Sequence, residues 1–290
     1  MRAVALLGPN ADADDVAAFA TAARISIPTH NAIDLSAPPD VALIFGGDGT
    51  VHRHLAALVQ TQIPVLIVPA GSGNDFARAL GLKTRERAMA AWRRFCDTGK
   101  NVRAIDVGEI TAIDHRPSTI DLFCCVAGAG MDADVNRRAN NLPRWLRANG
   151  GYALSVVAGA LRFRPQRITV EFEDEKGAAG TISEPALMCA FANANAYGHG
   201  MRIAPRAQVD DGLLDLVFVR KAGAARLLTL FPTVYFGAHM GIREVEYRRV
   251  RRLSISSETP LDIYADGEFI CQTPAEVRVR PKALNVIYNL

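Results

Sequence analysis

The sequence predicts two different kinds of domain in one chain, an α/β domain first and a mostly antiparallel β domain second. In roughly the first hundred residues, short apolar runs alternate with helical patterns, which is typical of a parallel sheet covered by helices. From about residue 105 onward, β-rich segments follow one another and are bounded by Gly, Pro, Asp and Asn. The chain has 290 residues, of which 49% are hydrophobic, so it is long enough to bury a substantial core.

The first domain, residues 1–104, is predicted to alternate strands with helices. Apolar runs predict three buried strands, and the spacing of apolar residues between and after them predicts four helices. The strands are residues 4–7, 41–45 and 65–68, and the helices are residues 12–23, 51–60, 74–80 and 85–97.

The second domain, residues 105–280, is predicted to be built from five strands and one apolar helix. Its strands are residues 120–127, 168–173, 186–193, 214–220 and 245–256. The helix, residues 152–163, is followed by Arg164 and by the helix breaker Pro165. The last segment, residues 281–290, is expected to pack back onto the first domain.

Composition argues against a nucleic-acid-binding protein, a disulfide-rich protein and a membrane-spanning protein. The formal charge of +3 comes from 33 basic and 30 acidic residues spread along the chain, which is too mild to indicate a nucleic-acid partner. The five cysteines show no CxxC spacing, so they are interpreted as reduced thiols of a cytoplasmic protein. No segment approaches the ~18 apolar residues of a membrane span. Any contact with a membrane is therefore expected from the aqueous side.

The strongest local signal is the motif Gly46-Gly47-Asp48-Gly49-Thr50, which lies between a predicted strand and a predicted helix. Glycines allow the backbone to approach a phosphate closely, and the amides at the start of a helix form an anion site. The central carboxylate favours a Mg²⁺ partner or a group that orients an acceptor hydroxyl. The alternative is an ordinary glycine-rich turn.

A second glycine-rich turn, residues 69–78, follows the next predicted strand. Loops at the carboxyl ends of neighbouring parallel strands face the same crevice, where α/β sheets bind ligands. Ser72 can donate to a phosphate oxygen, and Asn74 or Asp75 can cap the helix that follows. For Asp75, a capping role and a catalytic role both stay open.

The two motifs resemble the paired nucleotide-binding motifs of the diacylglycerol, sphingosine and ceramide kinases, and bacterial lipid kinases resemble them most. GGDGT alone is shared with NAD kinases and phosphofructokinases, but here the resemblance spans nearly the whole chain in the expected order. Its further segments are residues 128–133, 198–207, 210–215 and 266–268.

This resemblance implies a fold of the NAD kinase and diacylglycerol kinase type. ATP would bind the α/β domain, the second domain would be a β-sandwich, and the active site would lie in the cleft between them. Catalytic roles are implied for Glu268, Asp48 and Asp75. The implied nucleotide-binding residues are Thr29, Gly46, Gly47, Asp48, Gly49, Thr50, Val51, His52, Ser72 and Asn74.

Glu268, in the family's Asp-Gly-Glu motif, would be the general base, because transfer to a neutral alcohol requires a group that accepts its proton. A simple tight turn is the alternative, and Asp48 is the competing base. The resemblance also implies a structural Mg²⁺ held by the Asp211 side chain and the carbonyls of Gln208 and Leu213. A β-turn at Asp211 and Gly212 is compatible with such an ion.

Two regions are candidates for lipid contact. The apolar helix 152–163, preceded by a basic and aromatic segment at 144–147, suits a membrane surface, although a core helix is the more common role. The arginine-rich run 248–252 is interpreted first as a solvated edge strand and second as a contact for anionic lipid. His52 and Arg53 stand where the family commonly has Asn-Glu, so the role of that Glu does not carry over to this chain. The N-terminal region is shorter than in the family, which affects the adenine-side contacts, Thr29 among them.

The expected function is therefore transfer of the γ-phosphoryl group of ATP, with Mg²⁺, to the hydroxyl of a membrane lipid, with diacylglycerol as the expected acceptor. A NAD kinase-like enzyme and a catalytically weak lipid- or nucleotide-binding protein are the alternatives. The expected partner is the lipid substrate, met transiently at the inner face of the membrane, with no nucleic acid. A homodimer is left open.

Overall fold

The computed structural model describes residues 1–113, 120–140, 159, 163–198 and 200–289. The chain folds into two compact units. The first unit contains residues 1–107 and 281–290, and the second contains residues 108–280. The boundary expected after residue 104 falls inside a continuous strand, β5 (Val102–Ala112), because the change in sequence pattern near residue 105 does not interrupt this strand.

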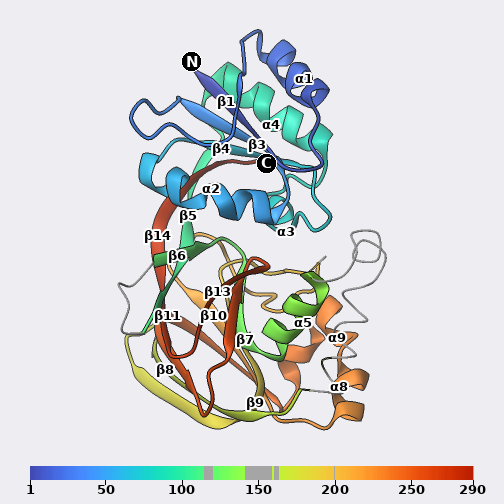
Figure 1. Ribbon diagram of the computed structural model, residues 1–290, viewed down its shortest axis with the longest axis vertical. Helices are drawn as coiled ribbons and strands as arrows, with labels where there is room; N and C mark the ends of the chain where they lie inside the picture. The colour runs from blue at the N-terminus through green and yellow to red at the C-terminus, as the bar shows by residue number, and fades with distance from the viewer. Residues whose placement is uncertain (114–119, 141–158, 160–162, 199, 290) are drawn as a thin grey trace. The chain divides into compact units, whose positions relative to one another are not determined.

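The first unit is a parallel sheet with helices on both faces (Figure 1). Its strands run in the order β4, β3, β1, β2, and each pairs in parallel with its neighbour. The strands are β1 (Ala3–Leu7), β2 (Thr29–His30), β3 (Val41–Gly46) and β4 (Val65–Pro69). The helices are α1 (Ala13–Ala23), α2 (Asp48–Thr61), α3 (Asp75–Ala79) and α4 (Arg85–Thr98). The predicted α/β architecture is thereby confirmed.

Aromatic side chains fix the helices on this sheet. The ring centroids of Phe19 in α1 and Phe45 in β3 lie 5.2 Å apart in an edge-to-face arrangement. The indole nitrogen of Trp92 in α4 donates to the Phe19 carbonyl at 3.0 Å. The C-terminal segment belongs to the same unit, because Val286 of β14 (Ala275–Ile287) pairs in parallel with Val65 of β4.

The second unit is built from antiparallel strands that fold over one another as a sandwich. Strand β9 (Ala179–Ala192) pairs first with β8 (Gln166–Asp174) and then with β10 (Leu214–Arg220). Strand β11 (Val245–Ser257) likewise pairs with β10 and then with β8. The β-sandwich prediction is confirmed.

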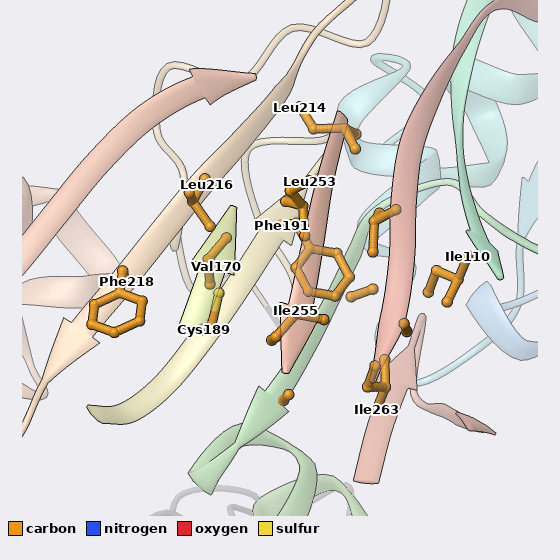
Figure 2. Close-up of a cluster of buried hydrophobic side chains, with 14 of the residues drawn as sticks. Ile110, Val170, Cys189, Phe191, Leu214, Leu216, Phe218, Leu253, Ile255 and Ile263 are labelled. Carbon is orange, nitrogen blue, oxygen red and sulfur yellow. The ribbon is translucent and has the colours of Figure 1, made fainter. Parts of the chain in front are cut away.

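Both long strands turn their apolar residues toward one core. Figure 2 shows side chains such as Phe191, Phe218 and Ile255 gathered between the strands, where each is fully buried. The arginine-rich run in β11 was predicted to lie on an edge strand, and the structure agrees only for its first part. Arg248 and Arg249 pair with β10 alone, whereas Arg252 pairs with both β8 and β14.

Other elements differ from the prediction. The predicted strand 120–127 is two strands, β6 (Ile120–Phe123) and β7 (Val126–Gly130), separated by a two-residue turn. The predicted helix 152–163 and the segment 144–147 fall almost entirely outside the described residues. The sequence pattern did not reveal β12 (Asp262–Ala265), β13 (Glu268–Gln272), α5 (Met131–Asn140), α8 (Ala224–Leu230), α9 (Thr233–Phe236) and the short 3₁₀ helix η2 (Ala238–Gly241).

The helices and the cysteines agree with the expectations from composition. Within the described part of the chain, no helix combines the length and the apolar character needed to cross a bilayer. All five cysteines are free thiols, and Cys124, Cys125 and Cys189 are buried.

Candidate functional site

Three loops of the first unit meet at one edge of the parallel sheet. Gly8 follows β1, Gly46 and Gly47 end β3, and the loop 71–73 follows β4. Because these strands are parallel neighbours, their carboxyl ends lie at the same edge, as the sequence predicted for the second and third loops. The Gly8 loop was not predicted to take part, although a glycine directly after a buried strand is the signal that could have revealed it.

The loops after β3 and β4 touch through their backbones. A Cβ atom on Gly71 would lie 2.5 Å from the Cα of Gly47, and a Cβ on Gly47 would lie 2.9 Å from the Cα of Gly71. A Cβ on Gly8 would lie 2.6 Å from the hydroxyl oxygen of Thr50. Between Gly47 and Gly71 the atoms in the way are backbone, so a side chain at either position would push these two loops apart, whereas at Gly8 it would displace the Thr50 side chain.

Asp48 links the two glycine-rich loops. Its Oδ2 accepts the amide of Asp75 at 3.1 Å, and its Oδ1 accepts the amide of Phe76 at 3.0 Å. Asp48, the first residue of α2, therefore caps the N-terminus of α3 from across the site. Asp48 and Asp75 are 27 positions apart in the sequence, too far for a local capping pattern to reveal this contact.

The predicted cap of α3 by Asn74 or Asp75 is wrong. Asn74 stands at the capping position with φ of 55°, but its amide group turns back to the N–H and the carbonyl of Gly71, at 2.9 and 2.7 Å. Asp75 is buried and pairs with the guanidinium of Arg78 one turn later in α3. Asn74 thus closes the loop 71–74 on itself, and the capping position is served by Asp48.

The remaining predicted nucleotide residues lie in α2, in the loop after β4 and in β2. Thr50 and Val51 are buried in the first turn of α2, where their amides bond to the Gly47 carbonyl at 2.9 and 3.1 Å. Ser72 is exposed in the loop after β4, and His52 is half-buried in α2. Thr29 is exposed in the edge strand β2. Their nucleotide-binding roles stay predictions.

Glu268 stands on a hairpin of the second unit. Strands β12 and β13 pair Ala265 with Glu268, so the turn consists of Asp266 and Gly267, with φ values of 50° and 91°. Two positive φ values are the mark of the tight hairpin turn that Asp-Gly favours. The Asp-Gly-Glu motif therefore does form a tight turn, and Glu268 is its exposed outgoing residue. The Glu268 side chain makes no hydrogen bond or ion pair with the described part of the chain.

The Asp266 carboxylate fastens this hairpin to the turn between β6 and β7. It accepts the amides of Cys124, Cys125 and Val126 at 2.7, 2.9 and 3.2 Å. The Asp266 amide in return donates to the Val126 carbonyl at 3.0 Å. Fully buried Asn193 holds the other side of the turn, since its side-chain amide donates to the Cys124 carbonyl at 3.0 Å. The backbone beneath Glu268 is thus held by bonds in both directions.

The predicted structural Mg²⁺ loop, residues 208–213, forms an ion pair with an arginine of β11. Asp211 Oδ1 accepts the Leu213 amide at 3.1 Å, which is the turn expected from Asp211 and Gly212. Asp211 Oδ2 pairs with the guanidinium of Arg249, which also meets Glu175 at 3.0 Å. Main-chain carbonyls and one carboxylate suit a hard cation, but here the carboxylate is already neutralised by Arg249. The ion at Gln208, Asp211 and Leu213 stays a prediction.

An apolar cavity of about 90 Å³ lies within the second unit and was not foreseen. It is lined by α5, α8, α9 and the strands β9 and β10, with Met131, Met188, Leu227, Phe231 and Val234 among its walls. Its polar lining residues are Asp132, Tyr197, His239 and Glu244, and the Tyr197 hydroxyl donates to Asp132 Oδ1 at 2.6 Å. Burial raises the pKa of Asp132 to about 6, an effect that this hydrogen bond partly offsets. The cavity escaped prediction because α8 and α9 were not recognised.

Comparison with known proteins gives consistent matches along the chain. Residues 20–110 match the family model described as the diacylglycerol kinase catalytic domain. Residues 125–288 match that of the YegS C-terminal NAD kinase beta sandwich-like domain. A diacylglycerol kinase from Mycobacterium tuberculosis is 35% identical over 257 residues, which cover 86% of this chain and 76% of that protein.

Two solved structures share the fold. A diacylglycerol kinase from Bacillus anthracis superposes with a TM-score of 0.67 at 16% identity, covering 99% of this chain and 97% of that one. An NAD kinase from Archaeoglobus fulgidus, solved in complex with ATP, gives a TM-score of 0.55 at 12% identity, covering 100% and 94%. At these identities the likeness extends to the fold alone.

Proposed function

Because the chain belongs to the diacylglycerol kinase family of lipid kinases, we propose that it transfers the γ-phosphoryl group of Mg-ATP to the free hydroxyl of diacylglycerol. The observation that carries this proposal is the pair of glycine loops that touch at Gly47 and Gly71 and are tied together by Asp48. Such an edge presents backbone to a phosphate chain without side chains in the way, beside the positive end of the α2 dipole.

The chain's own residues have distinct parts in this proposal. The loops after β3 and β4 bind the triphosphate, and the exposed Ser72 hydroxyl donates to a phosphate oxygen. Both Asp48 oxygens accept backbone amides at the start of α3, which holds this carboxylate where the two loops meet. We assign Asp48 and the neighbouring Asp75 to the magnesium ion of ATP, which would neutralise charge on the phosphates.

Glu268 is the proposed general base. Its carboxylate is exposed and carries no competing hydrogen bond within the described residues, whereas both Asp48 oxygens already accept backbone amides. A base must reach the hydroxyl proton as the phosphoryl group transfers, and a carboxylate committed to capping a helix is poorly suited to move toward it. This difference favours Glu268 over Asp48.

The experiment is transfer of ³²P from γ-labelled ATP to a panel of acceptors in mixed micelles. The panel contains diacylglycerol, monoacylglycerol, ceramide, sphingosine and phosphatidylglycerol, with NAD in a separate reaction. Glu268→Gln is compared with Glu276→Gln, which removes another exposed strand carboxylate of the second unit. We expect labelled phosphatidate from the wild type and from Glu276→Gln, and little from Glu268→Gln. Labelled NADP, or no product from any acceptor, would contradict the proposal.

A further inference from the structure

We propose that the outer face of α8 and α9 docks this protein on an anionic lipid bilayer, with Phe236 entering the bilayer and the exposed basic side chains on and beside these helices meeting the lipid phosphates. The proposal rests on the proposed function, because a kinase acting on diacylglycerol must reach a lipid that stays in a bilayer. The docking face comprises Arg202, Lys221, Arg226, Tyr235, Phe236 and Arg243, all of which are exposed.

Phe236 is the most exposed large apolar side chain of the described residues. It ends α9 with 81% of its surface in contact with solvent, and its neighbour Tyr235 is 39% exposed. Single exposed apolar residues are common on protein surfaces, so exposure alone carries no argument. What distinguishes Phe236 is the helix pair on which it stands and the charge around that pair.

The helix pair has apolar side chains on both of its sides. Leu227, Phe231 and Val234 turn inward and line the apolar cavity, and Tyr235 meets Phe231 edge to face at 5.8 Å. Figure 1 shows α8 and α9 side by side, next to α5. Because the inner sides of both helices face one cavity, their outer sides face away from it together. A surface helix normally presents polar residues outward, so the exposed aromatic pair Tyr235 and Phe236 at the end of α9 indicates a partner.

Four exposed cations lie on or beside α8, α9 and η2. Lys221 and Arg226 flank the start of α8, Arg243 follows η2, and the Arg202 amide donates to the Val234 carbonyl of α9 at 3.1 Å. Within the described part of the chain, Glu244 is the one carboxylate that pairs with this set, through Arg226 at 3.3 Å and Arg243 at 3.4 Å. The docking face therefore keeps a net positive charge.

The arginine-rich run 248–252 behaves differently. Arg249 pairs with Asp211 and Glu175, Arg252 pairs with Glu173 at 2.7 Å, and Arg248 pairs with Glu246. These arginines are largely neutralised by their own neighbours. The segment that looks most basic in the sequence is thus a weaker candidate for anionic lipid than the four cations brought together from separate segments.

An anionic bilayer is the occupant that matches both features. Aromatic side chains insert at the boundary between headgroups and acyl chains, and exposed Lys and Arg are attracted to anionic headgroups within a Debye length. One inserted phenylalanine and a few cations give weak and reversible binding that salt weakens. Such binding suits an enzyme that visits a membrane to collect its substrate.

The test is flotation of the full chain with vesicles of phosphatidylcholine, with and without phosphatidylglycerol, in the absence of diacylglycerol and nucleotide. Phe236→Ser and the double variant Arg226→Ser/Arg243→Ser are compared with matched controls. Leu35→Ser removes an apolar side chain that is 49% exposed in the first unit. Arg248→Ser/Arg252→Ser removes the same charge from the paired run.

We expect the wild type and both controls to float with the anionic vesicles and to dissociate at high salt. The two docking-face variants should bind on the order of tenfold more weakly. Equal flotation of Phe236→Ser and wild type, or equal losses in the controls, would overturn the proposal. If sedimentation shows a dimer that Phe236→Ser dissociates while vesicle binding is unchanged, the face is a contact between two copies instead.

Failure of docking can be distinguished from failure of the proposed kinase activity. A short-chain diacylglycerol dispersed as monomers does not require a bilayer, so Phe236→Ser should phosphorylate it as fast as the wild type. On long-chain diacylglycerol in anionic vesicles, the same variant should be slower. Turnover of the short-chain lipid without any flotation overturns docking alone, whereas flotation without turnover of either lipid overturns the kinase assignment alone.

Discussion

Replacing Asp266 by Asn should loosen the hairpin that carries Glu268 without touching Glu268 itself. The Asp266 Oδ1 atom accepts the amides of Cys125 and Val126, and Oδ2 accepts the amide of Cys124. Asparagine has a single acceptor oxygen. If that oxygen keeps the two amides on Oδ1, the side-chain NH₂ group faces the Cys124 amide, and a buried donor loses its partner.

The expected cost follows from these bonds. A hydrogen bond to a charged group contributes about 1.5–3 kcal/mol, and leaving a buried donor unsatisfied costs about 1–3 kcal/mol. We therefore expect Asp266→Asn to destabilise the turn between β6 and β7 by about 2–4 kcal/mol. Asp262→Asn is the matched control in the same hairpin, since Asp262 accepts one exposed side-chain bond from Gln272 that asparagine can also accept.

Hydrogen exchange and kinetics together measure this effect. In Asp266→Asn, amides of residues 124–126 should exchange faster, and kcat should fall by roughly ten- to a hundredfold because Glu268 is less well placed. The KM for ATP should stay near its wild-type value. In a Glu268→Gln background, Asp266→Asn should cause little further loss of kcat, because both changes act through one group. Wild-type protection and wild-type kcat in Asp266→Asn would refute the reasoning.

Three further perturbations probe other parts of the molecule. Gly71→Ala should weaken ATP binding, measured by titration calorimetry, because its Cβ would lie 2.5 Å from the Cα of Gly47; unchanged affinity would contradict the contact between the loops. Burial raises the pKa of Asp132 from 3.8 to about 6, so between these pH values the folded protein holds a proton that the unfolded chain has released. The free energy of unfolding therefore falls as the pH rises from about 4 to 6. Asp132→Asn should therefore be more stable than the wild type by about 3 kcal/mol in urea titrations above pH 7, and by much less at pH 4; the opposite trend would count against a buried, raised carboxyl. Asp211→Asn should lower the melting temperature equally in Mg²⁺ and in EDTA, because it removes the partner of Arg249; a loss seen only with Mg²⁺ would reveal a bound ion instead.

The sequence predicts well where the structural signals are local. The buried runs that become β1, β3 and β4 are short and apolar, and the turns after β3 and β4 are marked by glycines, so strands and loops were recognised together. The sandwich strands β8 to β11 were also predicted. Strand β10 has the predicted bounds, whereas β9 begins well before its predicted start.

Features that depend on residues far apart in the sequence could not be predicted from it. The break between β6 and β7 occurs at Cys124 because Asp266, 142 positions later, takes the amides that a continuous strand would have used. The capping of α3 depends on Asp48 for the same reason, since no local pattern reports a cap from another loop. Helices α8 and α9 are short, and α9 has only four residues, too few for a helical period to show.

The most direct test of the proposed kinase reaction is which phosphorus atom moves and to which oxygen. Purified protein should be incubated with Mg²⁺, diacylglycerol micelles and ATP labelled either at the γ- or at the α-phosphorus, and the lipid should then be extracted. The proposed function predicts phosphatidate labelled from γ-labelled ATP alone, lost when Mg²⁺ is chelated and in Glu268→Gln. Label in the lipid from the α position, or unlabelled lipid alongside intact ATP binding, would contradict it.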